Sequence, residues 1–196
     1  DNEGNLVDGD QLIYIVAMGR QRLGDLRGPV VGTVMSNLGL ERKLAEQQIP
    51  FIRANVGDRY VMSDLKKHGG VIGGESSRHI ICLDRATTGD GMVSALQLLE
   101  IIQATGKTLA QLASDMPLYP QEMINVRIAE RMDIDNEPEI QAASAAIGEE
   151  LGDRGRIVLR ASGTEPVIRV MVEGIDGVQV RAAAERLAEA VRKVAG

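Results

Sequence analysis

The segment RASGTEP, which begins at Arg160, has residue types that bind small anions. Gly163 permits a left-handed backbone that turns successive amide groups toward one point, and such a nest binds anions. Ser162 and Thr164 supply hydroxyl donors, the guanidinium of Arg160 can hold two phosphate oxygens, and Arg169 offers a second cation. The same residues also suit an ordinary polar hairpin turn, and residue types alone support both interpretations equally.

A second polar segment, GGESSRH, begins at Gly73. Glu75, Ser76 and Ser77 have the groups that hydrogen-bond neighbouring sugar hydroxyls, with Glu accepting and Ser both donating and accepting. His79 is suited to proton transfer near neutral pH. Taken alone, this pattern favours the simpler alternative of a polar loop with an ordinary histidine.

Metal and nucleotide motifs are not supported. His79 and Cys82 have the spacing of a ligand pair, but the chain has only one other histidine, His68, and no second cysteine. A structural zinc site needs more ligands, so we predict no metal site in this chain. The sequence at 105–108, TGKT, resembles the end of a phosphate-binding P-loop, but position 101 is Ile where that motif needs Gly. No G-x-G-x-x-G motif follows an expected strand.

The composition excludes several classes of protein. The chain has 196 residues, 44% of them hydrophobic, only 2% aromatic, and a net charge of -6. Few aromatic faces and an acidic balance disfavour a nucleic-acid surface, although a local basic pocket remains compatible with a small anion. No apolar stretch approaches membrane-spanning length, and the single cysteine fits a reducing cytosol, so we expect a cytoplasmic protein. The first residues, DNEGNLVDGDQ, read neither as a signal peptide nor as a domain start, which predicts that the chain begins inside a longer protein.

The first part of the chain alternates helices and strands, which predicts an α/β layer domain. We interpret the pair Asp8 and Asp10 as a helix cap, with a strand as the alternative for the segment that follows. The expected elements are a helix after residue 10, strands at 29–35 and 50–56, helices at 38–48 and 57–68, strands at 71–72 and 79–83, and a helix from 90 to 106.

The order of expected helices and strands changes after Pro117 and Pro120. These two prolines predict a linker. Beyond it we expect a strand at 123–128, a helix from Pro138 to about Leu151, strands at 156–159 and 167–172, and a helix at 178–194. The two later strands pair naturally as a hairpin. The order β-α-β-β-α predicts an antiparallel sheet with helices on one face.

The two polar segments occur in order with NVGDRYV at 55–61 and TGDG at 88–91, and together these motifs resemble the α-D-phosphohexomutase family. The resemblance runs along nearly the whole chain. It implies that residues 1–115 are most of that family's third, sugar-binding domain, without its N-terminal part. Residues 122–196 would be the fourth, phosphate-binding domain, an α+β fold like that of the TATA-binding protein.

The resemblance also implies an activity. The family interconverts 6-phospho and 1-phospho sugars through a bisphosphate, and the nearest branch acts on glucosamine phosphates for UDP-N-acetylglucosamine and cell-wall synthesis. A glucose- or mannose-phosphate mutase and a non-catalytic phosphosugar-binding module are the alternatives. By resemblance, Glu75 and Ser77 hold sugar hydroxyls, His79 lies near the reacting oxygen, and Arg59 faces the substrate. The phosphate that is not transferred would be held by Arg160, Ser162, Gly163, Thr164 and Arg169.

Two family features and one residue differ here. The phosphoserine that carries the transferred group and the Mg²⁺-binding loop would lie before residue 1, in N-terminal domains that would act as this chain's partners. The family pattern has Gly where this chain has Arg78. If that position has a positive φ, Arg adds a strain of about 1–2 kcal/mol, and its side chain would intrude on the sugar site or reach a phosphate.

Overall fold

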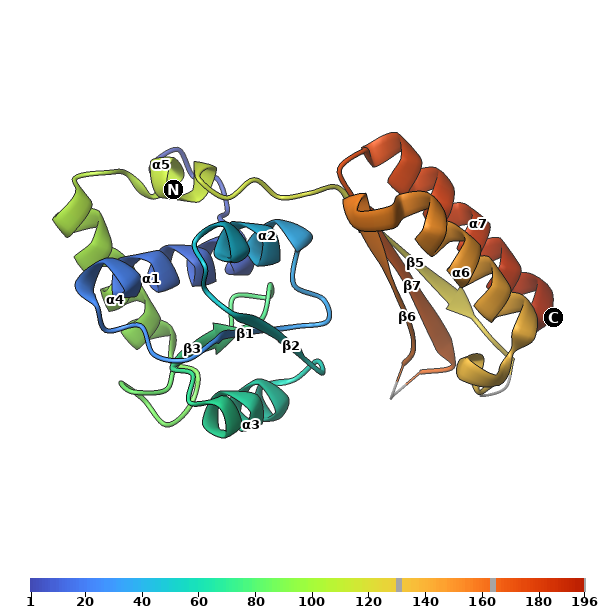
Figure 1. Cartoon of the computed structure of the whole chain (residues 1–196), viewed down its shortest axis with the longest axis horizontal. Helices are drawn as coiled ribbons and strands as arrows, with labels where there is room; N and C mark the ends of the chain where they lie inside the picture. Colours follow the sequence, from blue (N-terminus) through green and yellow to red (C-terminus); the bar gives the residue numbers. More distant parts are fainter. Residues whose placement is uncertain (130–131, 163–164, 196) are drawn as a thin grey trace. The chain divides into compact units, whose positions relative to one another are not determined.

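The computed structural model describes residues 1–129, 132–162 and 165–195, and it separates into two compact units, 1–118 and 119–196 (Figure 1). Each unit has its own hydrophobic core. The first unit is a mixed α/β layer and the second combines two helices with an antiparallel sheet, as the sequence predicts.

The first unit contains a four-stranded sheet in the order β2-β1-β3-β4. Strand β1 pairs in parallel with β2 and β3, and β4 runs antiparallel to β3. Its elements are α1 (Gly9–Leu23), β1 (Val30–Thr33), α2 (Leu38–Glu46), β2 (Phe51–Ala54), α3 (Asp58–His68), β3 (Ile72–Gly74), β4 (Ile80–Cys82), α4 (Gly91–Thr105) and α5 (Leu109–Ser114).

Helix ends in this unit follow from local sequence. The side chain of Asp8 caps α1 in a capping box with Gln11, which confirms the helix rather than the strand alternative. Asp90 caps α4 by accepting hydrogen bonds from the amides of Met92 and Val93. Gly69 ends α3 in the left-handed conformation that glycine adopts without strain.

Helix α5 corrects the sequence interpretation, which assigned no element to 109–114. Thr108 caps this short helix by accepting from the amide of Gln111, whose side chain in turn accepts from the amide of Thr108. The TGKT segment is therefore the junction between α4 and α5. The strands are also shorter than predicted, since β1 and β2 each have four residues.

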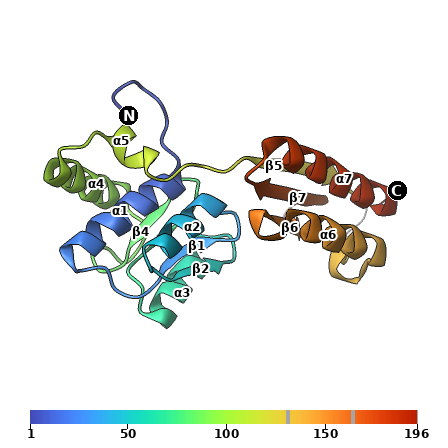
Figure 2. The same ribbon diagram turned by 45° about the horizontal axis from the view of Figure 1, so that its top comes forward.

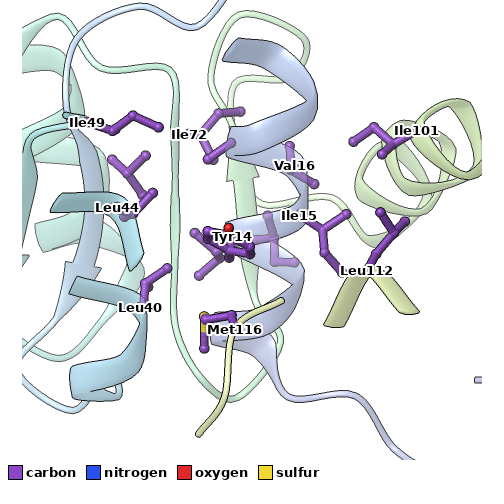
Figure 3. Close-up of a cluster of buried hydrophobic side chains, with 14 of the residues drawn as sticks. Tyr14, Ile15, Val16, Leu40, Leu44, Ile49, Ile72, Ile101, Leu112 and Met116 are labelled. Atoms are coloured by element: carbon purple, nitrogen blue, oxygen red, sulfur yellow. The ribbon is translucent and has the colours of Figure 1, made fainter. Parts of the chain in front are cut away.

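The sheet lies between two layers of helices (Figures 1 and 2). Val30 packs in the cluster with α1, α2 and α5, whereas the next residue, Val31, packs in the cluster with α3. Successive strand residues point to opposite faces, so a strand covered on both sides is apolar at every position. Figure 3 shows the larger cluster, in which Tyr14 of α1 lies between Leu40 of α2 and Leu112 of α5.

The second unit contains a three-stranded antiparallel sheet in the order β5-β7-β6, with α6 and α7 on one face (Figures 1 and 2). The predicted hairpin and the helix start at Pro138 are confirmed. Its elements are β5 (Gln121–Arg127), a 3₁₀ turn (Ile134–Asn136), α6 (Pro138–Leu151), a second 3₁₀ turn (Gly152–Arg154), β6 (Gly155–Ala161), β7 (Val167–Gly174) and α7 (Gly177–Ala195).

Successive residues of the central strand β7 point alternately into the core and to the outward face of the sheet. Ile168, Val170 and Val172 of β7 pack against the helices in the core. Arg169 lies between the first two and therefore points to the opposite, outward face. The strand pattern thus exposes a guanidinium group on the face that no helix of this unit covers.

Candidate functional site

The candidate site of the first unit is the edge where the three parallel strands end. Strands β1, β2 and β3 finish at Thr33, Ala54 and Gly74, and their parallel pairing brings these ends together. Ligands of open α/β sheets bind at this carboxyl edge. The loops that begin there carry Gly57 after β2 and Glu75 after β3.

The carboxylate of Glu75 is held by the neighbouring loop. Its Oε1 accepts a hydrogen bond of 2.8 Å from the amide of Gly57, and the hydroxyl of Ser77 lies 3.5 Å from Oε2. Gly57 has a φ of 123°, a conformation that a side chain would strain. The structure thus brings Glu75 and Ser77 together, with Oε2 free of any strong partner among the described residues.

His79 is fixed from two sides. Its Nδ1 lies 2.7 Å from Oδ2 of Asp58, and the imidazole is 45% exposed. On the other side, a Cβ at Gly89 would lie 2.2 Å from Nε2, so only glycine leaves room for this ring. The three motifs at 55–61, 73–79 and 88–91 therefore meet at one imidazole, an arrangement that presents Nε2 for proton exchange when Nδ1 donates to Asp58.

Arg78 has a φ of 75°, which is the positive φ anticipated for this position. Its Nε donates a hydrogen bond of 3.1 Å to the carbonyl of Val7, and its own amide donates to the carbonyl of Glu75. The guanidinium is thus engaged by the segment before α1, a role that the sequence alternatives of sugar-site intrusion or phosphate contact did not include.

Arg59 is exposed at the start of α3 and stacks on its neighbour. Its guanidinium carbon lies 4.5 Å from the centre of the Tyr60 ring. Among the described residues, no hydrogen bond or ion pair joins Arg59 to Glu75 or His79, and its role toward a substrate stays a prediction.

Asp10 is the residue of this region that the sequence analysis misjudged. Asp8 alone is the helix cap, whereas Asp10 is fully buried and its Oδ2 accepts a 2.7 Å hydrogen bond from the amide of Asn37. Burial raises the pKa of Asp10 to about 6, since the desolvated carboxylate is disfavoured. Oδ1 has no hydrogen-bond partner among the described residues. A helix cap needs only one of the two aspartates. The second aspartate was therefore the signal in the sequence that one of them has another role.

The candidate site of the second unit is the outward face of its sheet beside the β6–β7 connection. Arg160 of β6 pairs directly with Arg169 of β7, so both side chains point to the same face. The amide of Ser162 donates to the carbonyl of Val167, and the Ser162 hydroxyl accepts a 3.4 Å hydrogen bond from the amide of Glu165. The other two predicted phosphate ligands, Gly163 and Thr164, lie outside the described residues.

The two arginines lack a counter-charge. No carboxylate in the described part of the chain lies within ion-pairing distance of Arg160 or Arg169. Burial, and secondly the charge of Arg169, lower the pKa of Arg160, and its buried Nε has no hydrogen-bond partner among the described residues. A dianion such as phosphate would neutralise the charges of both guanidinium groups.

A cavity of about 400 Å³ lies on the β5 side of this pair. It is lined by Asn125, Arg127, Glu165, Pro166, Val167 and Arg169. The sequence analysis did not select Arg127. Arg127 is two positions from Asn125 in a predicted strand, so both side chains would be expected on one face of the sheet. No nearby residue indicated that this face points outward.

The described residues contain neither a candidate metal site nor a candidate membrane-spanning helix. Within residues 1–129, 132–162 and 165–195, no three or more His, Cys, Asp or Glu side chains are grouped as a metal ion requires. The described helices include none that is long and apolar enough to cross a membrane.

Comparison with protein families matches both units. Residues 8–119 match the model "Phosphoglucomutase/phosphomannomutase, alpha/beta/alpha domain III", and residues 123–190 match "Phosphoglucomutase/phosphomannomutase, C-terminal domain".

Similar curated proteins cover the whole chain. Over 193 residues, or 98% of the chain, it is 54% identical to a phosphoglucosamine mutase of Methylococcus capsulatus, of which it covers 43%. Over 195 residues it is 54% identical to a phosphoglucosamine mutase of Nitrosospira multiformis, covering all of this chain and 42% of that protein. The chain therefore spans less than half the length of these relatives.

A solved structure shares the fold. Aspergillus fumigatus N-acetylphosphoglucosamine mutase, crystallised with GlcNAc-6P and magnesium, matches 99% of this chain with a TM-score of 0.79 at 23% identity. The match covers 46% of the fungal chain. At that identity the similarity concerns the fold alone.

Proposed function

Because this chain belongs to the phosphoglucomutase/phosphomannomutase family, we propose that it is the sugar- and phosphate-binding part of a phosphoglucosamine mutase. The longer enzyme would interconvert glucosamine 6-phosphate and glucosamine 1-phosphate through a bisphosphate, in the cytoplasm, for amino-sugar and peptidoglycan precursor synthesis. The observation that carries the proposal is the pair Arg160 and Arg169, which point to the same face, have no counter-charge among the described residues and suit a phosphate dianion.

The proposal gives each unit one task. Residues 1–115 would bind the sugar, with Glu75 and Ser77 contacting hydroxyls and Arg59 facing the substrate. Residues 122–196 would hold the phosphate that stays on the sugar, through Arg160, Arg169 and the segment 162–164. A phosphosugar would thus be recognised at both ends, and no nucleic acid or membrane is a proposed partner.

His79 would exchange a proton with the sugar oxygen that gains or loses the phosphoryl group. Asp58 holds Nδ1, so Nε2 is the atom that carries out this exchange. Phosphoryl transfer depends mainly on positioning and charge stabilisation, which suits binding groups built on fixed loops and strands.

The attacking serine and Mg²⁺ are assigned in this proposal to other parts of the longer enzyme. When bound there, Mg²⁺ would supply charge neutralisation for the transferred phosphoryl group. The described residues of this chain do not fit a metal ion, and no step proposed here passes through one.

The test joins this chain to the N-terminal part of the Methylococcus relative, at the position where the alignment begins. With Mg²⁺ and a sugar bisphosphate activator, we expect turnover of glucosamine 6-phosphate well above that of glucose 6-phosphate and mannose 6-phosphate. The 196-residue chain alone, as the control, should give none. Preference for glucose or mannose phosphates would reassign the substrate. A folded, phosphate-binding chimera without any turnover would instead support the alternative of a binding module.

A further inference from the structure

Arg127 adds a third guanidinium group to the outward face of the second unit's sheet. In the β5–β7 ladder, Asn125 pairs with Arg169 and Arg127 pairs with Val167. Paired residues and residues two apart on one strand share a face, so Arg127 lies on the same face as Arg169, one row further along.

That next row is the one at the β6–β7 connection. Val167 accepts the amide hydrogen bond of Ser162, and the residue after Arg127, Ile128, donates from its amide to the carbonyl of Pro166. The backbone at Arg127 is therefore held beside Pro166 and Val167, and Val167 in turn is bonded to Ser162. Arg160 and Ser162 flank this connection from β6, and Arg127 flanks it from β5.

The cavity beside Arg169 gives Arg127 a place to act. Arg127, Arg169 and Asn125 line the same cavity of about 400 Å³, a volume within the range of small-molecule sites. Arg160 does not line it. Arg169 therefore lies beside Arg160 on one side and lines the cavity on the other.

The charge of Arg127 is as unpaired as that of its neighbours. No carboxylate of the described residues lies within 4 Å of its guanidinium, although Glu165 lines the same cavity. The chain carries a net charge of -6, so acidic partners are plentiful in the sequence. Three guanidinium groups on one face, with no ion pair to any described residue, point to a dianionic ligand rather than to a salt-bridge network.

We propose that Arg127 is a further phosphate-binding residue, which closes the β5 side of the site that Arg160, Ser162 and Arg169 form. The ligand is a phosphate monoester dianion, and Asn125 donates to it beside Arg169. This inference rests on the phosphate site of the proposed function and extends it by one cation that the sequence motif does not include.

An NMR titration of the 196-residue chain with inorganic phosphate tests the inference. We expect weak binding, with a dissociation constant on the order of millimolar, and shifts of the amides at 125–128 as well as 160–169. Arg127→Gln should weaken binding about 3- to 20-fold, less than the effect of Arg160→Gln, because water screens a more exposed charge. Arg127→Lys should recover part of the loss, since it keeps the charge without the planar fork.

Arg181→Gln is the matched control. Arg181 is an exposed residue of α7, on the helical side of the same unit, and its removal changes the net charge equally. Equal effects of Arg127→Gln and Arg181→Gln would overturn the inference, because only long-range charge would then be involved.

The outcomes also separate this inference from the proposed function. If wild type binds phosphate and only Arg160→Gln reduces binding, Arg127 is a solvated surface residue and the proposed phosphate site stands. If wild type does not bind phosphate, or binds it at amides away from this face, both are wrong. The two-dimensional spectrum of each variant verifies that it is folded before titration.

Discussion

Asp58 and His79 come from different loops at the same edge of the sheet, and Oδ2 of the first lies 2.7 Å from Nδ1 of the second. Asp58 begins α3 directly after the connection from β2, whereas His79 follows β3. Parallel pairing of both strands with β1 brings the two loops together. The carboxylate orients the imidazole ring by holding Nδ1, which leaves Nε2 as the nitrogen for the proposed proton exchange.

Asp58→Asn should therefore lower kcat of the chimeric enzyme by about tenfold or more with little change in KM, because an amide can either accept from or donate to Nδ1 and so no longer fixes which ring nitrogen carries the proton. Steady-state kinetics with glucosamine 6-phosphate measure both constants. Asp64→Asn, at a position on α3 that forms no ion pair with His79 in the described part of the chain, is the control. An unchanged kcat in Asp58→Asn would remove His79 from the proposed proton transfer.

Gly89→Ala should displace the His79 ring without unfolding the unit. The new methyl would lie 2.2 Å from Nε2, and a half-exposed imidazole can rotate away at little cost. NMR signals of the His79 ring should shift, and activity of the chimera should fall in parallel. Gly91→Ala is a matched control, since no atom lies within 4 Å of a Cβ there. Identical ring signals in wild type and Gly89→Ala would contradict the packing of Gly89 against the imidazole.

Local signals account for what the sequence predicted correctly. Caps such as Asp90, the proline at 138 and the turn residues between β6 and β7 act over a few residues, so the helices and the hairpin could be predicted directly. Helix α5 was missed because six residues are too few for a helical period to appear.

Long-range placement accounts for the rest. The sequence gives Asp8 and Asp10 equal claim to the helix cap, and only the backbone of Asn37, 27 positions away, distinguishes them. The contact of Asp58 with His79 depends likewise on strand order. The residue types at 75–79 are compatible with sugar binding, but they do not show which neighbours hold those groups.

The buried carboxyl of Asp10 predicts a specific pH dependence. Its pKa is about 6 in the folded unit against about 3.9 for an unfolded aspartate, so the folded state binds more protons between these values. The free energy of unfolding of the first unit should therefore fall as pH rises from about 4 to 6, by at most about 3 kcal/mol from this group. Below pH 4 the contribution is fully present, and above pH 6 it is lost.

Asp10→Asn should remove that component. An amide oxygen can still accept from the amide of Asn37, but the side chain no longer titrates. Urea unfolding followed through methyl NMR signals of Ile13 and Ile15 reports on the first unit alone. The stability of Asp10→Asn relative to wild type should increase as pH rises from 4 to 6.5, whereas Asp64→Asn should retain the wild-type slope. A constant difference for Asp10→Asn across this range would refute the assignment.

At position 78, the usual order of stability of alanine and glycine variants should reverse. At an ordinary position, glycine destabilises by about 0.5–1 kcal/mol relative to alanine because it loses more backbone entropy on folding. At a φ of 75°, an L-residue other than glycine carries a strain of about 1–2 kcal/mol. Both Arg78→Ala and Arg78→Gly remove the hydrogen bond to Val7, so their difference isolates the backbone term. Arg78→Gly should be the more stable variant by about 0.5–1 kcal/mol, measured by the same unfolding experiment. If Arg78→Ala is as stable as Arg78→Gly or more stable, the backbone at position 78 is not held in the left-handed conformation.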